Sequence, residues 1–200
     1  MGLPRLVLLD ARCRGLDPAG LRRWAREVSA TREGRSSRSY RYPLALVGWH
    51  HRPLGVDLER VEPCEPSFAE LICTPWERAL LAGAADPDRF LASLWSSKEA
   101  LAKLLGDPLH SVPSQVPSPL SWPDDHHRAL RAAPVALPDG FVGWACWRAT
   151  PPQRPDPALV LRPALAEAEW PVRQPAGVAA ASTQRWPSQR TEATHPPPSQ

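Results

Sequence analysis

Lysine is nearly absent from this chain, since Lys98 and Lys103 are the only two among 24 basic residues. The four cysteines form no Cys-x-x-Cys pair and no ladder with histidines, which argues against a disulfide framework or a zinc knuckle and fits a reducing compartment. No apolar run reaches transmembrane length, and the run at 6–9 ends at Asp10, too short for a signal segment. We therefore expect a cytoplasmic protein with no membrane contact. The net charge of +3 is too small to indicate a nucleic-acid partner.

Hydrophobic residues make up 42% of the 200 positions, which is enough for a buried core. Apolar periodicity and capping signals predict three helices, at 17–29, 75–84 and 87–105. Apolar runs predict a first strand at 6–9 and two β-hairpins, 44–49 with 54–59 and 135–137 with 141–147. The Arg- and Ser-rich stretch 31–39 is assigned to a loop. Helices that alternate with hairpins indicate an α+β fold with an antiparallel sheet and packed helices, and no internal repeat is visible.

The end of the chain is rich in proline, with 11 of the 26 prolines after residue 150. A proline-rich stretch with few large apolar side chains cannot offset the conformational entropy that it would lose on folding. We therefore predict a disordered tail at 163–200, after a last short strand at 158–161.

The expected strand at 54–59 carries two carboxylates on one face. Because side chains alternate along a strand, Asp57 and Glu59 share the face opposite the apolar residues, about 7 Å apart. Two carboxylates at that spacing repel each other unless water or a cation lies between them, and hard oxygen ligands suit Mg²⁺. An ordinary edge strand with two solvated acids is the competing interpretation.

The helix at 87–105 holds both lysines of the chain, around a single glutamate. Glu99 and Lys103 are i,i+4 neighbours, whereas Lys98 falls inside the apolar stripe, where an ammonium group is costly unless it is paired or hydrated. Glu99 would complete a Mg²⁺ site begun by the strand carboxylates, and the two lysines would face a phosphate-bearing ligand. The competing interpretation is a salt-bridged surface helix on which the Lys98 side chain reaches out to solvent.

Together the two segments resemble a known family. Gly55-Val56-Asp57-Leu58-Glu59 and Trp95-Ser96-Ser97-Lys98-Glu99-Ala100-Leu101-Ala102-Lys103 are similar, in order and spacing, to the paired motifs of the 4′-phosphopantetheinyl transferase superfamily. The resemblance spans about residues 37–147. It is closer to the Sfp-like branch than to the short holo-acyl-carrier-protein synthases, because a strand and a helix precede the first motif. It implies transfer of 4′-phosphopantetheine from coenzyme A to a serine of an acyl or peptidyl carrier protein, with release of adenosine 3′,5′-bisphosphate.

The resemblance also implies residue roles. Asp57, Glu59 and Glu99 would hold Mg²⁺ against the coenzyme A pyrophosphate. Lys103 would contact that pyrophosphate as a catalytic residue, and Lys98 would act by its charge near the phosphates or the carrier. Glu77 matches a glutamate proposed as general base for the serine hydroxyl. In a Thr-Pro-Trp-Glu sequence it is equally the partner of a helix capping box.

Two departures from the family pattern are visible. The family often has Ser-His-Ser where this chain has Ser37-Arg38-Ser39, so Arg38 either binds a coenzyme A phosphate or is a solvated loop arginine. The segment before the transferase domain is shorter than in the Sfp-like branch. We therefore divide the chain into a shortened N-terminal half at 1–40, a transferase domain at 41–162 and the tail. Part of the family's nucleotide-binding surface is then missing. Either loop arginines or another chain supply it, or the activity is impaired.

Other functions stay open. A non-catalytic relative would bind a carrier protein or coenzyme A without turnover. A nucleic-acid-binding module rests only on the excess of arginine, and no aromatic–basic motif supports it. Arg22, Arg23 and Arg26 form a basic helix face that is either solvated or complementary to an acidic carrier. The sequence leaves undecided the pathway of the carrier, the role of the tail and whether the protein is a monomer or a dimer.

Overall fold

The computed structural model describes residues 3–106, 112–122 and 129–149, so the predicted strand at 158–161 and the tail at 163–200 lie outside the described residues. The described part is α+β, with antiparallel sheets and packed helices, as predicted. The first sheet has the order β1 (Arg5–Asp10), β3 (Leu44–His50), β2 (Arg35–Arg41). The second has the order β4 (Leu54–Arg60), β6 (Phe141–Arg148), β5 (Leu130–Pro134). The helices are α1 (Pro18–Ala30), α2 (Pro66–Ile72), α3 (Pro75–Ala82) and α4 (Pro87–Leu105).

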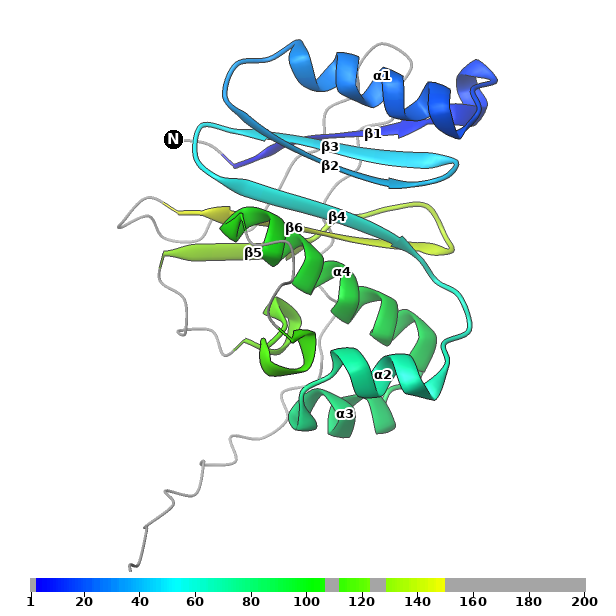
Figure 1. The fold of residues 1–200 in the computed structure, drawn as a ribbon, viewed down its shortest axis with the longest axis vertical. Helices are drawn as coiled ribbons and strands as arrows, with labels where there is room; N and C mark the ends of the chain where they lie inside the picture. Colours follow the sequence, from blue (N-terminus) through cyan, green and yellow to red (C-terminus); the bar gives the residue numbers. More distant parts are fainter. Residues whose placement is uncertain (1–2, 107–111, 123–128, 150–200) are drawn as a thin grey trace, which may run out of the picture.

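One topology occurs twice in the chain. The order β1-α1-β2-β3 forms the first sheet and its helix, and the order β4-α4-β5-β6 forms the second, with α2 and α3 inserted after β4 (Figure 1). In each sheet the last strand is central and pairs with the other two in antiparallel fashion. The first unit continues through β3, so a boundary after residue 40 falls inside the β2–β3 hairpin. The repeat is one of topology, which the sequence does not display.

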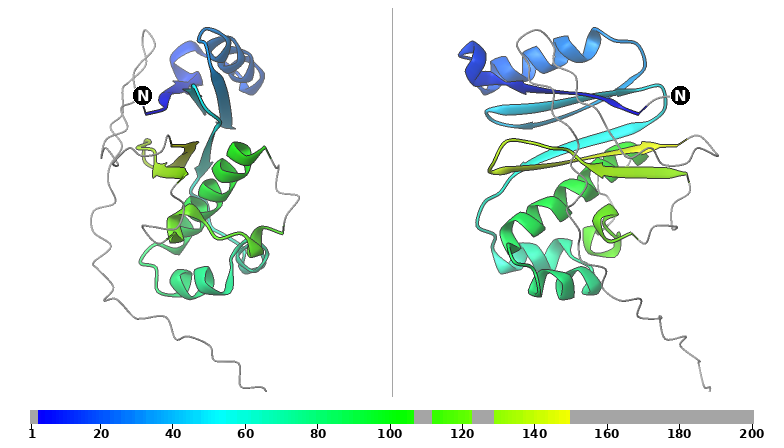
Figure 2. Two further views of the ribbon diagram at one scale, coloured as in Figure 1. Left: turned by 90° about the vertical axis from the view of Figure 1, so that its left-hand side faces the viewer. Right: turned by 180° about the vertical axis from the view of Figure 1, so that it is seen from behind.

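The helices cover the outer faces of the two sheets. Leu21, Trp24 and Ala25 of α1 pack on β1 and β3, while Ala100, Leu101 and Leu104 of α4 pack on β6. The inner faces pack against each other through residues of β1, β3, β4 and β6. Figures 1 and 2 show α1 and α4 on opposite sides of the strands. Every residue of β3 is buried because one of its faces meets α1 and the other meets the second sheet.

The first predicted hairpin is wrong. Residues 44–50 and 54–60 are both strands, but they pair within different sheets, because β3 already has a partner on each edge. The second hairpin is confirmed only in its second strand, β6. Residues 135–137 lie in the connection before β6, and the strand that pairs with β6 is Leu130–Pro134. The helices predicted at 17–29, 75–84 and 87–105 are confirmed as α1, α3 and α4.

The predicted loop at 31–39 is wrong as well, since most of it belongs to β2. This strand lies beside β4 and is joined to it by side chains: the backbone N–H of Val56 donates to Ser37 Oγ at 3.0 Å, and Ser39 Oγ donates to Asp57 Oδ1 at 2.7 Å. Because β2 contacts β4 through serine and arginine side chains, it needs few apolar residues. Its composition therefore resembles that of a loop. The residues that it brings to β4 include the acidic pair.

Among the described residues, none of the helices combines the length and the apolar character that a membrane crossing requires.

Candidate active site between β2, β4 and α4

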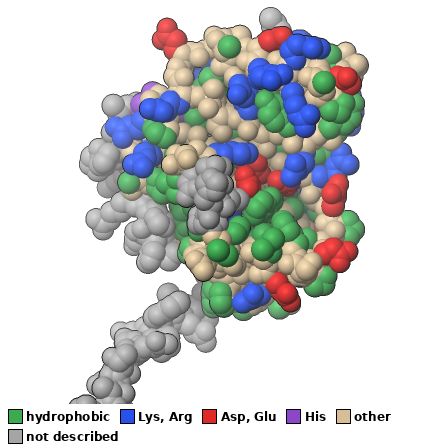
Figure 3. All heavy atoms as spheres, in the orientation of Figure 1, with side chains coloured by type: hydrophobic (Ala, Val, Ile, Leu, Met, Phe, Trp, Pro, Cys, Tyr) green, Lys and Arg blue, Asp and Glu red, His purple; other side chains and the backbone are tan. Residues whose placement is uncertain are grey.

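Three carboxylates line one cavity of about 310 Å³. Asp57 and Glu59 reach it from β4, and Glu99 reaches it from α4. The same cavity is lined by three basic side chains, those of Arg38, Arg41 and Lys103, and by Ser39, Tyr40 and Trp95. In Figure 3, acidic side chains gather near the middle of the face shown, between basic groups above and hydrophobic groups below. The structure therefore brings the predicted metal-binding set and Lys103 together at one open site.

Gly55 allows β4 and α4 to approach this closely. A Cβ atom at Gly55 would lie 1.9 Å from the carbonyl oxygen of Ala100 and 2.6 Å from the backbone nitrogen of Leu104. Lys103 crosses at the same level, and its Nζ donates to Asp57 Oδ1 at 2.7 Å and to the carbonyl oxygen of Val56 at 3.3 Å. The glycine of the first motif thus serves the contact between the strand and the helix that carries the second motif.

The electrostatics of the cavity favour an added cation. Burial and the charge of Asp57 raise the pKa of Glu59 to about 7, against the lowering effect of Arg41. Burial and the charge of Asp57 also raise the pKa of Glu99. Asp57 Oδ2 is buried and has no hydrogen-bond partner. A buried carboxylate oxygen without a donor is costly, and a divalent cation would satisfy it.

The described residues contain no group of three His, Cys, Asp or Glu that already converges on a metal position. The ion pairs of the site explain this arrangement. Lys103 holds Asp57, and Arg41 donates to both oxygens of Glu59, from Nε to Oε2 and from Nη2 to Oε1, the latter at 2.9 Å. The donor set of three carboxylates therefore fits a hard cation by its chemistry, and these pairs must open for all three to bind it.

Lys98 does not line the cavity, which corrects its assignment to the phosphates or the carrier. Its side chain is fully buried, and Nζ donates to Glu77 Oε2 at 2.7 Å and to the carbonyl oxygens of Ile72 and Pro113 at 2.5 and 2.9 Å. An ammonium group has three N–H donors, and all three are used. The apolar stripe of α4 thus tolerates a lysine because the charge is paired.

Glu77 is also fully buried, and the capping-box interpretation is the one that the geometry bears out. Its Oε2 accepts from the backbone N–H of Thr74 at 2.8 Å and from Lys98, and its Oε1 accepts from the backbone N–H of Ser118 at 2.6 Å. A carboxylate enclosed in this way cannot meet a serine hydroxyl at the cavity. The assignment of Glu77 as a general base is not compatible with this position.

A second, basic cavity of about 380 Å³ adjoins the first. It is lined by Arg22, Arg26, Ser36, Ser37, Arg38, Tyr40 and Lys103. Arg38 and Lys103 line both cavities, and Arg38 Nη1 donates to Ser29 Oγ of α1 at 2.6 Å. Sequence reasoning left the α1 arginines as a general basic face, because their position beside residues 36–38 depends on β2 being a strand. Arg32, by contrast, stacks over Trp49.

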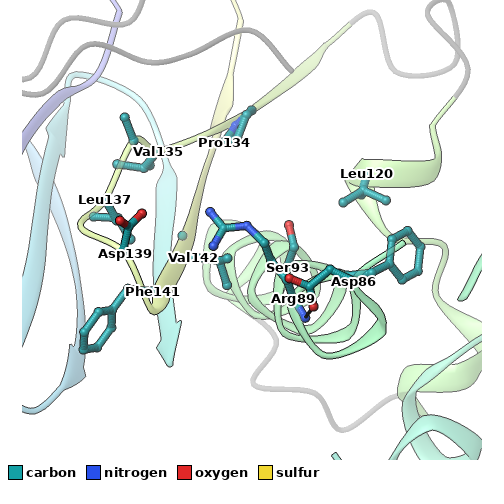
Figure 4. A pocket seen from close by; sticks show the side chains of 13 residues that line it. Asp86, Arg89, Ser93, Leu120, Pro134, Val135, Leu137, Asp139, Phe141 and Val142 are labelled. Atoms are coloured by element: carbon teal, nitrogen blue, oxygen red, sulfur yellow. Dashed lines mark hydrogen bonds between the residues drawn. The ribbon is translucent and has the colours of Figure 1, made fainter. Parts of the chain in front are cut away.

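Two further cavities flank α4. One of about 400 Å³ shares Arg41, Glu59 and Trp95 with the acidic cavity and continues over Cys64, Phe68 and Ala92. The other, of about 700 Å³, lies between the first half of α4 and the loop before β6, where Figure 4 shows Arg89, Ser93 and Leu120 around it. No residue of the carboxylate trio lines this larger cavity, so it is separate from the candidate active site.

The segment that contains this site is similar to a known family. The family model of the 4′-phosphopantetheinyl transferase superfamily matches residues 53–138, which include all three carboxylates and Lys103. This segment, less than half of the chain, is therefore similar to that superfamily. A crystal structure of holo-[acyl-carrier-protein] synthase from Thermotoga maritima is 19% identical, covers 61% of this chain and 82% of that chain, and superimposes with a TM-score of 0.40. No curated protein matches the sequence.

Proposed function

We propose that this protein transfers 4′-phosphopantetheine from coenzyme A to a serine of a carrier protein in a Mg²⁺-dependent reaction. The observation that carries the proposal is the convergence of Asp57, Glu59 and Glu99 at one cavity beside Lys103, within the segment that matches the superfamily. These residues come from two motifs some forty positions apart, and a purely structural role would not require their carboxylates to share an open cavity.

The carboxylates are assigned to the cation. Asp57 contributes its unpartnered Oδ2, Glu99 contributes a carboxylate with no hydrogen bond to the described residues, and Glu59 completes the set. A bound Mg²⁺ ion supplies charge neutralisation for the pyrophosphate of coenzyme A. Lys103 is assigned to the same pyrophosphate, since its side chain is 31% exposed and borders both cavities.

The adjoining basic cavity is assigned to the remaining phosphate of coenzyme A. Arg22, Arg26 and Arg38 place three permanent positive charges on it, and guanidinium groups bind phosphate in a bidentate manner. In this proposal the compact first half of the chain supplies its nucleotide-binding surface from α1 and β2 together. No second chain is needed for that surface.

The reaction is a displacement at phosphorus. The serine oxygen of the carrier attacks the β-phosphorus, an O–P bond forms, and the bond to the bridging oxygen breaks with its electron pair leaving on adenosine 3′,5′-bisphosphate. The serine proton is assigned to Glu99, directly or through water, because its carboxylate lines the cavity that the serine must enter. The chain's four free cysteines fit the reducing cytoplasm, where we place the reaction.

A second candidate is a non-catalytic relative that binds coenzyme A or a carrier without turnover. One observation favours it: the three carboxylates and the three basic side chains of the cavity already balance one another in charge. A site that is neutral by itself can persist without a metal ion.

The test is the intact mass of an apo-carrier protein after incubation with coenzyme A, Mg²⁺ and this protein. We expect a gain of one phosphopantetheine group that requires Mg²⁺ and is lost in Asp57→Ala and in Glu99→Ala. Glu33→Ala removes an exposed acid far along the chain from the motifs and is the matched control, with the full gain expected. Binding of coenzyme A with no mass gain on any apo-carrier would favour the non-catalytic relative, and full transfer by either cavity variant would refute the metal assignment.

A further inference from the structure

Arg41 is the one basic residue lining the acidic cavity whose role neither the motifs nor the proposed function assigns. It is the last residue of β2, and its guanidinium group donates to both oxygens of Glu59. The Arg41 side chain is 50% exposed, whereas that of Glu59 is 10% exposed. The arginine can therefore turn into solvent at little cost, but the glutamate that it leaves behind stays in a buried, acidic environment.

Glu59 needs a cation more than a surface acid does. Asp57 is on the same strand face two residues earlier, and Glu99 lines the same cavity, so three carboxylates repel one another there. Among the described residues, two cations form ion pairs with this trio: Arg41 with Glu59 and Lys103 with Asp57. Lys103 also borders the basic cavity, so an anionic ligand can draw it away from Asp57, but Arg41 does not line that cavity. Arg41 thus remains on Glu59 until another cation takes its place.

We infer that Arg41 is a built-in competitor for the metal position: it occupies Glu59 in the metal-free protein, and a divalent cation uses Glu59 only by displacing it. The inference rests on the cation site of the proposed function and concerns how strongly that site binds metal. A guanidinium charge is permanent, so the competition does not depend on the titration of Arg41. The competition lowers the affinity of the site for a metal ion that binds without a ligand. When the metal ion leaves, Arg41 pairs with Glu59 again.

The experiment is a direct titration of the protein with Mn²⁺, with free Mn²⁺ measured by electron paramagnetic resonance, and no coenzyme A or carrier present. At alkaline pH, where the carboxylates are ionised, Arg41→Gln should bind Mn²⁺ on the order of tenfold more tightly than the natural protein, which is the size of one broken charged pair. Arg41→Lys keeps the charge but loses the two-pronged contact, so its affinity should lie between the two. Arg35→Gln, at the opposite exposed end of β2, makes the same charge change and should leave the affinity unaltered.

A double-mutant cycle separates the pair from a general charge effect. If the competition runs through Glu59, Arg41→Gln should give no gain in a Glu59→Gln background. An equal gain in both backgrounds, or equal affinity of Arg41→Gln and the natural protein, would overturn the inference and leave the cation site intact. Failure of every variant to bind Mn²⁺ would instead refute the cation site of the proposed function, and the inference with it.

Discussion

Replacement of Lys98 by methionine tests whether this lysine is part of the fold or part of the ligand site. The Lys98→Met variant keeps most of the side-chain volume and removes the ammonium group. The carboxylate of Glu77 then stays fully buried without its cation, although the backbone N–H groups of Thr74 and Ser118 still donate to it. The carbonyl oxygens of Ile72 and Pro113 lose their donor as well.

The loss in stability should be large. Removal of one partner from a buried ion pair costs about 3–5 kcal/mol, because the remaining charge is left uncompensated. A domain of this size is stable by about 5–15 kcal/mol, so the variant should unfold at a markedly lower urea concentration, with a melting temperature lower by about 10 °C or more.

The assay is urea denaturation of the natural protein, Lys98→Met, Glu77→Gln and the double variant. Because both single changes break the same pair, the double variant should lose much less than the sum of the two single losses. Additive losses, or a Lys98→Met loss below about 1 kcal/mol, would refute the buried-pair account. A lysine that met a phosphate would show the opposite pattern, with unchanged unfolding and weakened binding of coenzyme A.

Two further predictions concern the cavity. Gly55→Ala would place a Cβ atom 1.9 Å from the Ala100 carbonyl oxygen, so α4 must move away from β4. We expect the free energy of unfolding in urea to fall by about 1–3 kcal/mol and Mn²⁺ binding to weaken. The control is Gly83→Ala, whose Cβ would meet only an atom at 3.8 Å and which should change neither quantity. The raised pKa of Glu59, about 7 against an ordinary 4.5, means that the folded protein binds more protons than the unfolded chain between these values. The free energy of unfolding should therefore fall by up to about 3 kcal/mol as pH rises from about 4.5 to 7. Saturating Mg²⁺ or the Glu59→Gln change should flatten this slope in thermal unfolding. A flat pH profile for the metal-free protein would contradict the prediction.

Local signals in the sequence predicted the parts of the fold that depend on nearby residues. The prolines and N-cap residues at 17–18, 74–75 and 86–87 mark the starts of three helices, and the period-2 pattern at 54–60 marks a strand with two acids on one face. The expectation that the two motifs meet came instead from the chemistry of their carboxylates and lysines and from the family resemblance. The short helix α2 has no comparable side-chain cap, and sequence reasoning missed it.

Contacts between distant residues were beyond such signals. The pairing of β3 with β1 rather than with β4, and the strand character of 35–41, depend on which sheet edges are free and on side-chain bonds from β2 to β4. The partners of Lys98 lie 15 to 26 residues away along the chain, so its position in an apolar stripe predicted that it needs a partner but not which one.

The central claim is that Asp57, Glu59 and Glu99 form a site for one divalent cation between β4 and α4. The most direct measurement is a crystal structure of the protein grown with Mn²⁺ and coenzyme A, with data collected at a wavelength that shows the anomalous signal of manganese. The account predicts a single strong anomalous peak at about 2–2.3 Å from oxygens of Asp57, Glu59 and Glu99. A coenzyme A molecule bound in the cavity with no anomalous peak beside these carboxylates would contradict it.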